Sequence, residues 1–562
     1  MLLALMIVVC MMRARAPAAP DIGVAFAASA GIDPAVESCA AAVAPATGRG
    51  TVAAATSSLP PMDDRAGWQQ LLAQVAPVLY RQGAAGGHAL AQLLGGRQWS
   101  IGPAPGLGVG LGVAAQGFRR RDGRREFPYF EQKMPLESVP ASGGLDRKAV
   151  KPFLASGPDL LAALAGASAA AGEYTYASQS LARVAGHQPD RRPAERGPQP
   201  PIGESMLPVL QALAATSKEG HASAAIWLGS AGASTPLHYD TSHNVYAQLS
   251  GNKTAVLLPP SAAALARLYP SLHPGYRQAQ LQPELQQRHG TEISRSPAAK
   301  LGAKALVVTL QPGDVLVLPP YWLHRMEAGA GAVAASVSWW VTAEDFLLTQ
   351  KAYQARIPFE RDWPVGKRTA AVFALLRLVH REINRRWPAA EPNGAPLLRP
   401  GSLHAALRSR YRHLYRQAFT KPTLEAGQVA PTPVDAEIPG GLCRSGLNGM
   451  RLSISSDANE TVALGWIYES GGLLAKSASW SAAVDELAML FGAQQSQPAV
   501  MAINLANFAE HLLMWSLQPL RSGPRPASKW LLPPPNTMLA PEAPWLPHLI
   551  AQCAELHLGD IT

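Results

Sequence analysis

The centre of the chain alternates short apolar runs with turn residues, a pattern typical of antiparallel strands. Runs rich in β-branched or apolar residues lie at 223–232, 244–259, 305–320 and 332–343. Turn composition at SGNK (250–253) and at QPGD (311–314) predicts a hairpin at each position. The predicted result is a small barrel or jelly roll of antiparallel strands.

Helical periodicity flanks this centre on both sides. A helix is expected over 63–83, where Trp68, Leu71, Leu72, Val75 and Leu79 follow an acidic start at helical intervals. Other segments with helical patterns lie at 157–172, 367–387, 401–419, 479–492 and 501–517. Together with the strands they predict an α+β chain, with a jelly-roll core, flanking helices and an additional C-terminal region.

Shifts in composition divide the chain into six segments. A targeting-like or disordered segment (1–61) precedes a helical part with early strands and a Pro- and Arg-rich insertion (62–220). The barrel core (221–345) and a helical region (346–420) follow. A Pro-containing linker (421–437) leads to a C-terminal region (438–562) that has no motif of known function.

Charge gives little indication of a partner. The chain has 562 residues, 48% of them hydrophobic, and a formal net charge of +10, but only 16% are charged and the basic residues are scattered. The densest basic stretch, RRRDGRRE at 119–126, mixes acidic with basic residues and contains no aromatic residue, which favours a solvated loop. The sequence therefore shows no clear nucleic-acid site.

Cysteine spacing and the N-terminus bear on the compartment. The four cysteines lie far apart and indicate neither a zinc site nor a disulfide scaffold: Cys10, Cys39, Cys443 and Cys553. The apolar run at 2–12 is too short to span a bilayer and is followed, not preceded, by basic residues, which fits a secretory signal poorly. A cytoplasmic or nuclear location is favoured, and organellar targeting by the first 60 residues stays open.

Three side chains in the predicted barrel have the composition of a metal site. His238 and Asp240 are two residues apart, so on one strand they share a face and can reach the same ion. His324, on a distant strand, is the third candidate ligand. Two imidazoles and one carboxylate that leave three coordination positions open are typical of non-haem iron(II) oxygenases.

Two further residues are suited to bind an acidic co-substrate. Lys253 follows the turn at Gly251, and its ammonium group can hold a distal carboxylate. Thr235 can add a hydroxyl hydrogen bond from the start of the strand that carries His238. An isolated His-x-Asp can also be an ordinary pair of surface residues on a strand. Lys253 favours a metal and co-substrate site over that alternative.

The motifs TPLHYD, HNVYAQLSGNK and QPGDVLVLPPYWLHRM, with LLPP and LYP between them, carry a family resemblance. In order and spacing they resemble the JmjC-type, cupin-like 2-oxoglutarate oxygenases, and within that family the asparaginyl hydroxylase type. The resemblance covers residues 170–345, and more loosely the helices to about 416. It implies an oxygenase that uses Fe(II), 2-oxoglutarate and O2 to hydroxylate a protein side chain.

Carried over by position, the resemblance implies roles for individual residues. His238, Asp240 and His324 would hold Fe(II), while Thr235 and Lys253 would bind 2-oxoglutarate. Further co-substrate contacts would come from Tyr176, which aligns with a tyrosine upstream of the barrel in the family, from Asn244 and from Ser338, where the similar hydroxylase has asparagine.

The same resemblance suggests partners. Arg277, Gln278 and Trp340 are candidate contacts for a protein or peptide substrate, whereas His243 is not at a ligand position. The helices between about 366 and 416 resemble a dimerisation region, so a homodimer is expected. A JmjC lysine demethylase and an inactive JmjC-fold binding or scaffold module are the alternatives.

Overall fold

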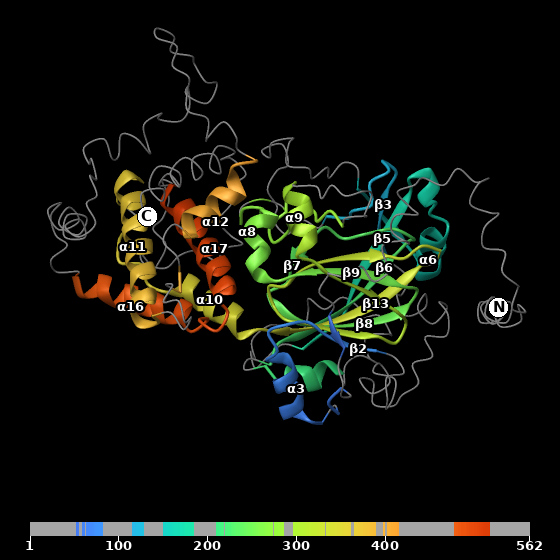
Figure 1. Cartoon of the computed structure of the whole chain (residues 1–562), viewed down its shortest axis with the longest axis horizontal. Helices are drawn as coiled ribbons and strands as arrows, with labels where there is room; N and C mark the ends of the chain where they lie inside the picture. Colours follow the sequence, from blue (N-terminus) through green and yellow to red (C-terminus); the bar gives the residue numbers. More distant parts are fainter. Residues whose placement is uncertain are drawn as a thin grey trace, which may run out of the picture. The chain divides into compact units, whose positions relative to one another are not determined.

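The computed structural model (Figure 1) divides the chain into two units, which are described separately. The first comprises 1–128, 146–262 and 281–344, and the second 129–145, 263–280 and 345–562. The residues that the structure describes are 52–54, 59–61, 63–81, 115–128, 150–184, 209–217, 220–271, 273, 275–285, 296–331, 333–360, 363, 365–388, 397–398, 402–414 and 477–517.

Two sheets form the first unit and confirm the predicted α+β class (Figure 1). The larger has the order β1-β2-β11-β8-β13-β6-β5-β3-β4 and the smaller the order β10-β9-β12-β7. All strand pairs are antiparallel except β1 with β2. The strands are β1 (Ala53–Ala54), β2 (Val78–Tyr80), β3 (Ala115–Arg120), β4 (Lys151–Ala155), β5 (Tyr174–Val184), β6 (Ala222–Gly229), β7 (His238–Tyr239), β8 (Ser242–Ser250), β9 (Lys253–Leu258), β10 (Leu306–Leu310), β11 (Val315–Leu318), β12 (Leu323–Ala328) and β13 (Ala334–Thr342).

The prediction of a hairpin at SGNK is wrong: a turn is present and connects β8 to β9, but these two strands do not pair with each other. The turn requires glycine. Gly251 has φ +60°, and a Cβ there would lie 2.7 Å from the carbonyl oxygen of Val333. The strands on either side of this turn belong to different sheets, so the turn carries the chain from one sheet to the other.

The prediction of a hairpin at QPGD is wrong, although a turn is present. β10 pairs with β9, whereas β11 pairs with β2 and β8. The physical reason lies in the turn's partners, because Gly313 donates its backbone N–H to Gln248 and Asp314 accepts the backbone N–H of Gln248. The Asp314 carboxylate also pairs with Arg81 at 2.8 Å. The turn is therefore bound to β8 instead of joining two paired strands.

The helix predicted over 63–83 is shorter than expected. Helix α3 (Arg65–Leu72) buries Trp68 and Leu71, but the chain then enters strand β2 and Val75 is 59% exposed. Pro77 explains the difference, since proline has no N–H for a helix and disfavours helical geometry in the residue before it. Helix α6 (Gly157–Ala165) is capped by Ser156, and helix α9 (Pro297–Ala303) is capped by Ser296.

Helices dominate the second unit, and the predicted periodic segments are confirmed as α11 (Val365–Arg386), α12 (Ser402–Tyr411), α16 (Ser477–Gly492) and α17 (Pro498–Leu517). Helices α8 (Ala263–Ala266) and α10 (Glu344–Gln354) lie earlier in the chain. α11 packs against α16 and α17, and α12 packs against α17. Their apolar faces form one buried cluster that includes Leu376, Val379, Phe491 and Phe508. The predicted linker 421–437 lies outside the described residues.

A buried ion pair lies inside this helical unit. Arg410 of α12 donates to the carboxylate of Glu510 on α17 at 2.6 Å, and the two side chains are 4% and 0% exposed. Ser271 donates both its backbone N–H and its hydroxyl to the other oxygen of Glu510. The pair therefore joins two helices to the segment 263–280 of the same unit.

Replacing Glu510 by glutamine is expected to lower the free energy of unfolding by about 3 kcal/mol, because Arg410 would stay buried without a counter-charge. Urea unfolding followed by tryptophan fluorescence measures the change. Glu382→Gln is the matched control: Glu382 pairs with the two-thirds exposed Arg385 and with Arg386, and Arg386 would keep Asp485 as a partner. Its loss should therefore cost clearly less than the loss of Glu510. Equal losses in the two variants would contradict the buried ion pair as a stabilising contact.

Candidate metal and co-substrate site

The structure brings His238, Asp240 and His324 together in the first unit. His238 lies on β7, Asp240 follows that strand, and His324 lies on β12 directly opposite His238 in the antiparallel pair. The Nε2 atom of His324 is 3.7 Å from Oδ2 of Asp240, and the possible ligand atoms of the three residues all lie within 4.8 Å of one another. This geometry suits a single ion.

Backbone carbonyls fix the tautomer of both histidines. Nδ1 of His238 lies 2.8 Å from the oxygen of Pro236, and Nδ1 of His324 lies 3.0 Å from the oxygen of Trp322. A neutral ring that donates from Nδ1 keeps the lone pair on Nε2, as in most metal-bound histidines. Burial, reinforced by the neighbouring His324, lowers the pKa of His238 to about 4, so this ring is neutral at physiological pH.

The donor set therefore fits a divalent metal. Two imidazoles and one carboxylate converge in a site where both histidines are buried and Asp240 is partly exposed. Three protein ligands leave coordination positions open, which matches a catalytic and not a closed structural site. Iron(II) fits this combination.

Lys253 is buried in the same unit without a carboxylate partner among the described residues. It begins β9, is 3% exposed, and donates to the hydroxyl of Ser336 at 2.6 Å and to the carbonyl oxygen of Trp227 at 3.4 Å. The Tyr246 ring lies 5.7 Å from the ammonium nitrogen of Lys253. The Tyr246 hydroxyl also donates a hydrogen bond to Ser336. Burial lowers the pKa of Lys253 to about 7, and an anionic ligand would restore the charged form.

Thr235 is buried and Tyr176 is partly buried. The hydroxyl oxygen of Thr235 accepts the backbone N–H of Met326 on β12 at 3.0 Å, which leaves its own proton for another acceptor. Tyr176 of β5 stacks on Phe127 with ring centroids 5.4 Å apart. Burial, with a smaller effect of Tyr246, raises the pKa of Tyr176, so its phenol is a neutral hydrogen-bond donor.

Asn244 and Ser338 lie on neighbouring strands of the larger sheet. The Nδ2 atom of Asn244 on β8 lies 3.5 Å from Oδ2 of Asp240. The Oδ1 atom of Asn244 is buried without a partner among the described residues. Ser338 of β13 accepts a hydrogen bond from the indole of Trp227 at 3.0 Å. Because it accepts, Ser338 keeps its hydroxyl proton available.

The predicted substrate contacts fall in both units. Trp340 of β13 donates its indole N–H to Oδ2 of Asp240 at 2.9 Å. Arg277 and Gln278 belong to the segment 263–280 of the second unit, where Arg277 has φ +68° and Gln278 is fully buried. A substrate role for these three residues stays a prediction. His243 lies outside the metal cluster, and burial lowers its pKa to about 4.

The sequence patterns did not predict Ser336, Tyr246 or Trp227 as residues of this site. Ser336 lies two residues before Ser338 on β13, so the period of a strand places both on one face. That signal was available in the sequence. Tyr246 and Trp227 resemble ordinary aromatic core residues, and no local pattern distinguishes them.

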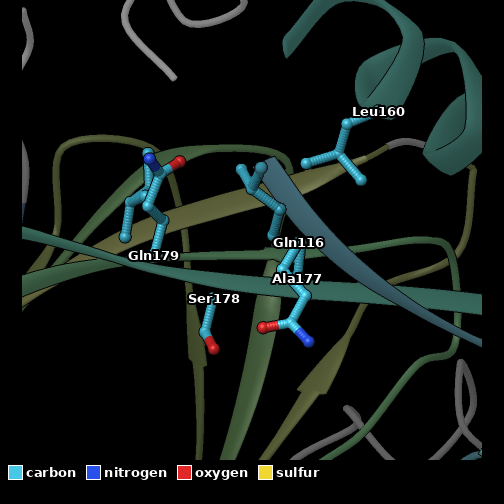
Figure 2. Close-up of a pocket in the computed structure, with 7 residues that line it drawn as sticks. Gln116, Leu160, Ala177, Ser178 and Gln179 are labelled. Carbon is cyan, nitrogen blue, oxygen red and sulfur yellow. The ribbon is translucent and has the colours of Figure 1, made fainter. Parts of the chain in front are cut away.

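A separate small pocket lies elsewhere in the first unit. Figure 2 shows it between the strands that carry Gln116, Ala177 and Gln179 and the side chain of Leu160 on α6. None of the predicted metal or co-substrate residues lines it. Its lining mixes apolar residues with the uncharged polar side chains of Gln116, Ser178 and Gln179, and none of the lining residues is ionisable.

Comparison with known proteins agrees with this geometry. Residues 116–346 match the cupin-like domain family, and this range forms most of the two antiparallel sheets. The first unit therefore contains a cupin-like domain with a jelly-roll core, as predicted.

Some of the curated relatives carry Jumonji-type names. Jumonji C domain-containing protein 5 of Drosophila melanogaster is 34% identical over 127 residues, 20% of this chain and 26% of the relative. Lysine-specific demethylase JMJ31 of Arabidopsis thaliana is 31% identical over 137 residues, 24% of this chain and 22% of the relative. HSPB1-associated protein 1 of Bos taurus is 33% identical over 121 residues, 21% of this chain and 24% of the relative.

The matches thus span about a quarter of the length of each relative. They support a domain of the JmjC cupin type, and the similarity to asparaginyl hydroxylases in particular stays a prediction. In the part of the chain that the structure describes, no helix is both long and apolar enough to cross a membrane.

The depressed pKa of Lys253 predicts a pH dependence of stability. The folded state releases this proton near pH 7 and the unfolded state near pH 10.5, so between these values the unfolded chain binds more protons and Lys253 makes stability rise with pH. Its contribution to the slope reaches about 1.4 kcal/mol per pH unit. Urea unfolding at several pH values should show a smaller rise in Lys253→Met than in the wild type.

Lys300→Met is the matched control, because Lys300 is exposed on α9. The control should keep the wild-type slope. A slope that is unchanged in Lys253→Met would mean that burial does not lower the pKa of this lysine.

Proposed function

We propose that the cupin-like domain is an Fe(II)- and 2-oxoglutarate-dependent oxygenase that hydroxylates a protein side chain, in the manner of an asparaginyl hydroxylase. The observation that carries the proposal is a His, Asp, His cluster in the same barrel as a buried lysine whose hydrogen bonds go only to neutral oxygens. A metal site alone would not require that lysine. An anionic co-substrate accounts for both.

Each proposed ligand residue would bind the metal through a defined group. His238 and His324 would bind Fe(II) through Nε2, since Nδ1 of both rings faces a backbone carbonyl, and Asp240 would bind through its carboxylate. When bound, Fe(II) with 2-oxoglutarate and O2 supplies the oxidation of a C–H bond to C–OH, with succinate and CO2 as co-products.

The protein's own task is to bind and orient the co-substrate. Lys253 would hold the distal carboxylate of 2-oxoglutarate by a charge-assisted hydrogen bond, and Thr235 and Tyr176 would add neutral donors. Ser336 keeps the ammonium group of Lys253 in place at 2.6 Å. Asn244 and Ser338 are proposed to contact the part of 2-oxoglutarate nearer the metal.

The proposed prime substrate is an extended peptide. Arg277 and Gln278, with Trp340, are its proposed contacts on the strength of the resemblance. The JmjC lysine demethylases are a second candidate class, because two relatives are named lysine-specific demethylases. Both activities begin with oxidation of a C–H bond, on a side-chain carbon or on an N-methyl group. An inactive JmjC-fold scaffold is the third alternative.

Anaerobic titration tests the proposal. Addition of Fe(II) and 2-oxoglutarate should produce the visible charge-transfer band of the chelate, and His238→Ala should lose it because one of the three ligands is gone. His243→Ala is the matched control, as His243 lies outside the metal cluster. A wild-type protein without the band, or a His238→Ala variant that keeps it, would refute the oxygenase.

An array of synthetic peptides separates the two enzyme classes. Peptides with a central asparagine, aspartate, histidine or lysine should gain the mass of one oxygen atom if the protein is a hydroxylase. Methylated lysine peptides should instead lose a methyl group if it is a demethylase. Succinate formation without any peptide would contradict the inactive scaffold.

A homodimer is proposed from the resemblance alone. The apolar faces of α11 and α12 already pack against α16 and α17 of the same chain. Sedimentation equilibrium of the full chain would show a monomer if the dimer is absent.

A further inference from the structure

A chain of side-chain contacts runs from Ser338 to the carboxylate of Asp240. Trp227 of β6 donates its indole N–H to Ser338 at 3.0 Å. Its ring meets Trp340 edge-on, with centroids 5.6 Å apart and an interplanar angle of 85°. Trp340 in turn donates its indole N–H to Oδ2 of Asp240 at 2.9 Å.

The sheet register explains why these residues meet. β13 pairs with β6 and β8, and Trp340 lies opposite Asn244 of β8. Trp227 lies opposite Ser336, so it reaches Ser338 along the diagonal that long side chains span on one face of an antiparallel pair. The three β13 residues Ser336, Ser338 and Trp340 alternate with core residues and therefore share this face.

Trp340 donates to the carboxylate oxygen of Asp240 that lies nearer to His324. Oδ2 of Asp240 is also the atom 3.7 Å from Nε2 of His324. A carboxylate oxygen has two lone pairs, so it can accept the indole N–H and keep the other pair for an ion. Asn244, at 3.5 Å from the same oxygen, is a much longer contact than Trp340.

We propose that Trp340 is a positioning residue for the metal-binding carboxylate of Asp240, and that Trp227 and Ser338 brace its indole. The inference rests on the proposed metal site. A carboxylate at the end of a strand can rotate, and a fixed donor removes that freedom before the ion arrives. Ser338 thereby has a role in this chain that its resemblance to an asparagine position does not supply.

The neighbouring residue provides a matched control. Trp339 is also on β13, points to the opposite face of the strand, and is fully buried. Its indole nitrogen has no hydrogen-bond partner among the described residues. Trp340→Phe and Trp339→Phe therefore make the same chemical change, but only the first removes a hydrogen bond to Asp240.

The experiment measures metal binding without a substrate. Anaerobic titrations with Fe(II) and with Co(II) should give dissociation constants at least tenfold higher for Trp340→Phe than for the wild type, and little change for Trp339→Phe. The visible absorption of bound Co(II), which reports the ligand field, should change only in Trp340→Phe. A purely structural role for Trp340 would not change that spectrum.

Ser338→Ala keeps Trp340 and removes the hydrogen bond from Trp227, so it tests the proposal even if Trp340→Phe folds poorly. The metal titration contains no 2-oxoglutarate, so the proposed co-substrate contact of Ser338 does not enter the result. Its metal affinity should fall between those of Trp339→Phe and Trp340→Phe. Wild-type affinity in both Trp340→Phe and Ser338→Ala would overturn the positioning role and leave the proposed function intact. A wild-type protein that binds neither Fe(II) nor Co(II) would overturn both.

Discussion

The register of β12 is the constraint on which the site depends. This strand is hydrogen-bonded on both sides, to β7 and to β9. The first pairing sets His324 opposite His238, and the second sets Ala328 opposite Lys253. The backbone of Met326 on the same strand exchanges hydrogen bonds with Thr235. Since side chains alternate along a strand, a slip of one residue would turn His324 away from His238.

Burial gives the site its chemical character. The same desolvation keeps His238 neutral and lowers the pKa of Lys253. One environment therefore favours an imidazole that can bind a metal and a lysine whose charged form is stabilised when an anion binds. The hydroxyl oxygen of Ser336 accepts a hydrogen bond from Lys253 and another from Tyr246. Such a site reduces the stability of the empty fold and becomes favourable when an acidic ligand binds.

Local patterns in the sequence predicted the elements better than their pairing. The strands and the helices α11, α16 and α17 were predictable because hydrophobic period and turn residues are local properties. The hairpins predicted at SGNK and QPGD are both wrong, because turn composition does not tell which strands pair. The strands beside SGNK belong to different sheets, and the QPGD turn is hydrogen-bonded to Gln248. His238 and Asp240 share a strand, but placing His324 beside them required knowledge of the fold. Trp340 was predicted as a substrate contact, and its hydrogen bond to Asp240 depends on a sheet register that no local pattern encodes.

The residues of the proposed function are distributed unequally between the two units. All metal ligands and the proposed co-substrate contacts belong to the first unit, whereas Arg277 and Gln278 belong to a segment of the second. The chain leaves the barrel after Ala262 and returns at Leu281, and within that excursion Ser271 is bound to Glu510 of α17. Under the proposed function, substitutions in the C-terminal helices would change how a peptide is contacted without altering the metal ligands. Trp340 is the proposed link between the two, because it is a proposed peptide contact and also donates a hydrogen bond to the metal-binding carboxylate of Asp240.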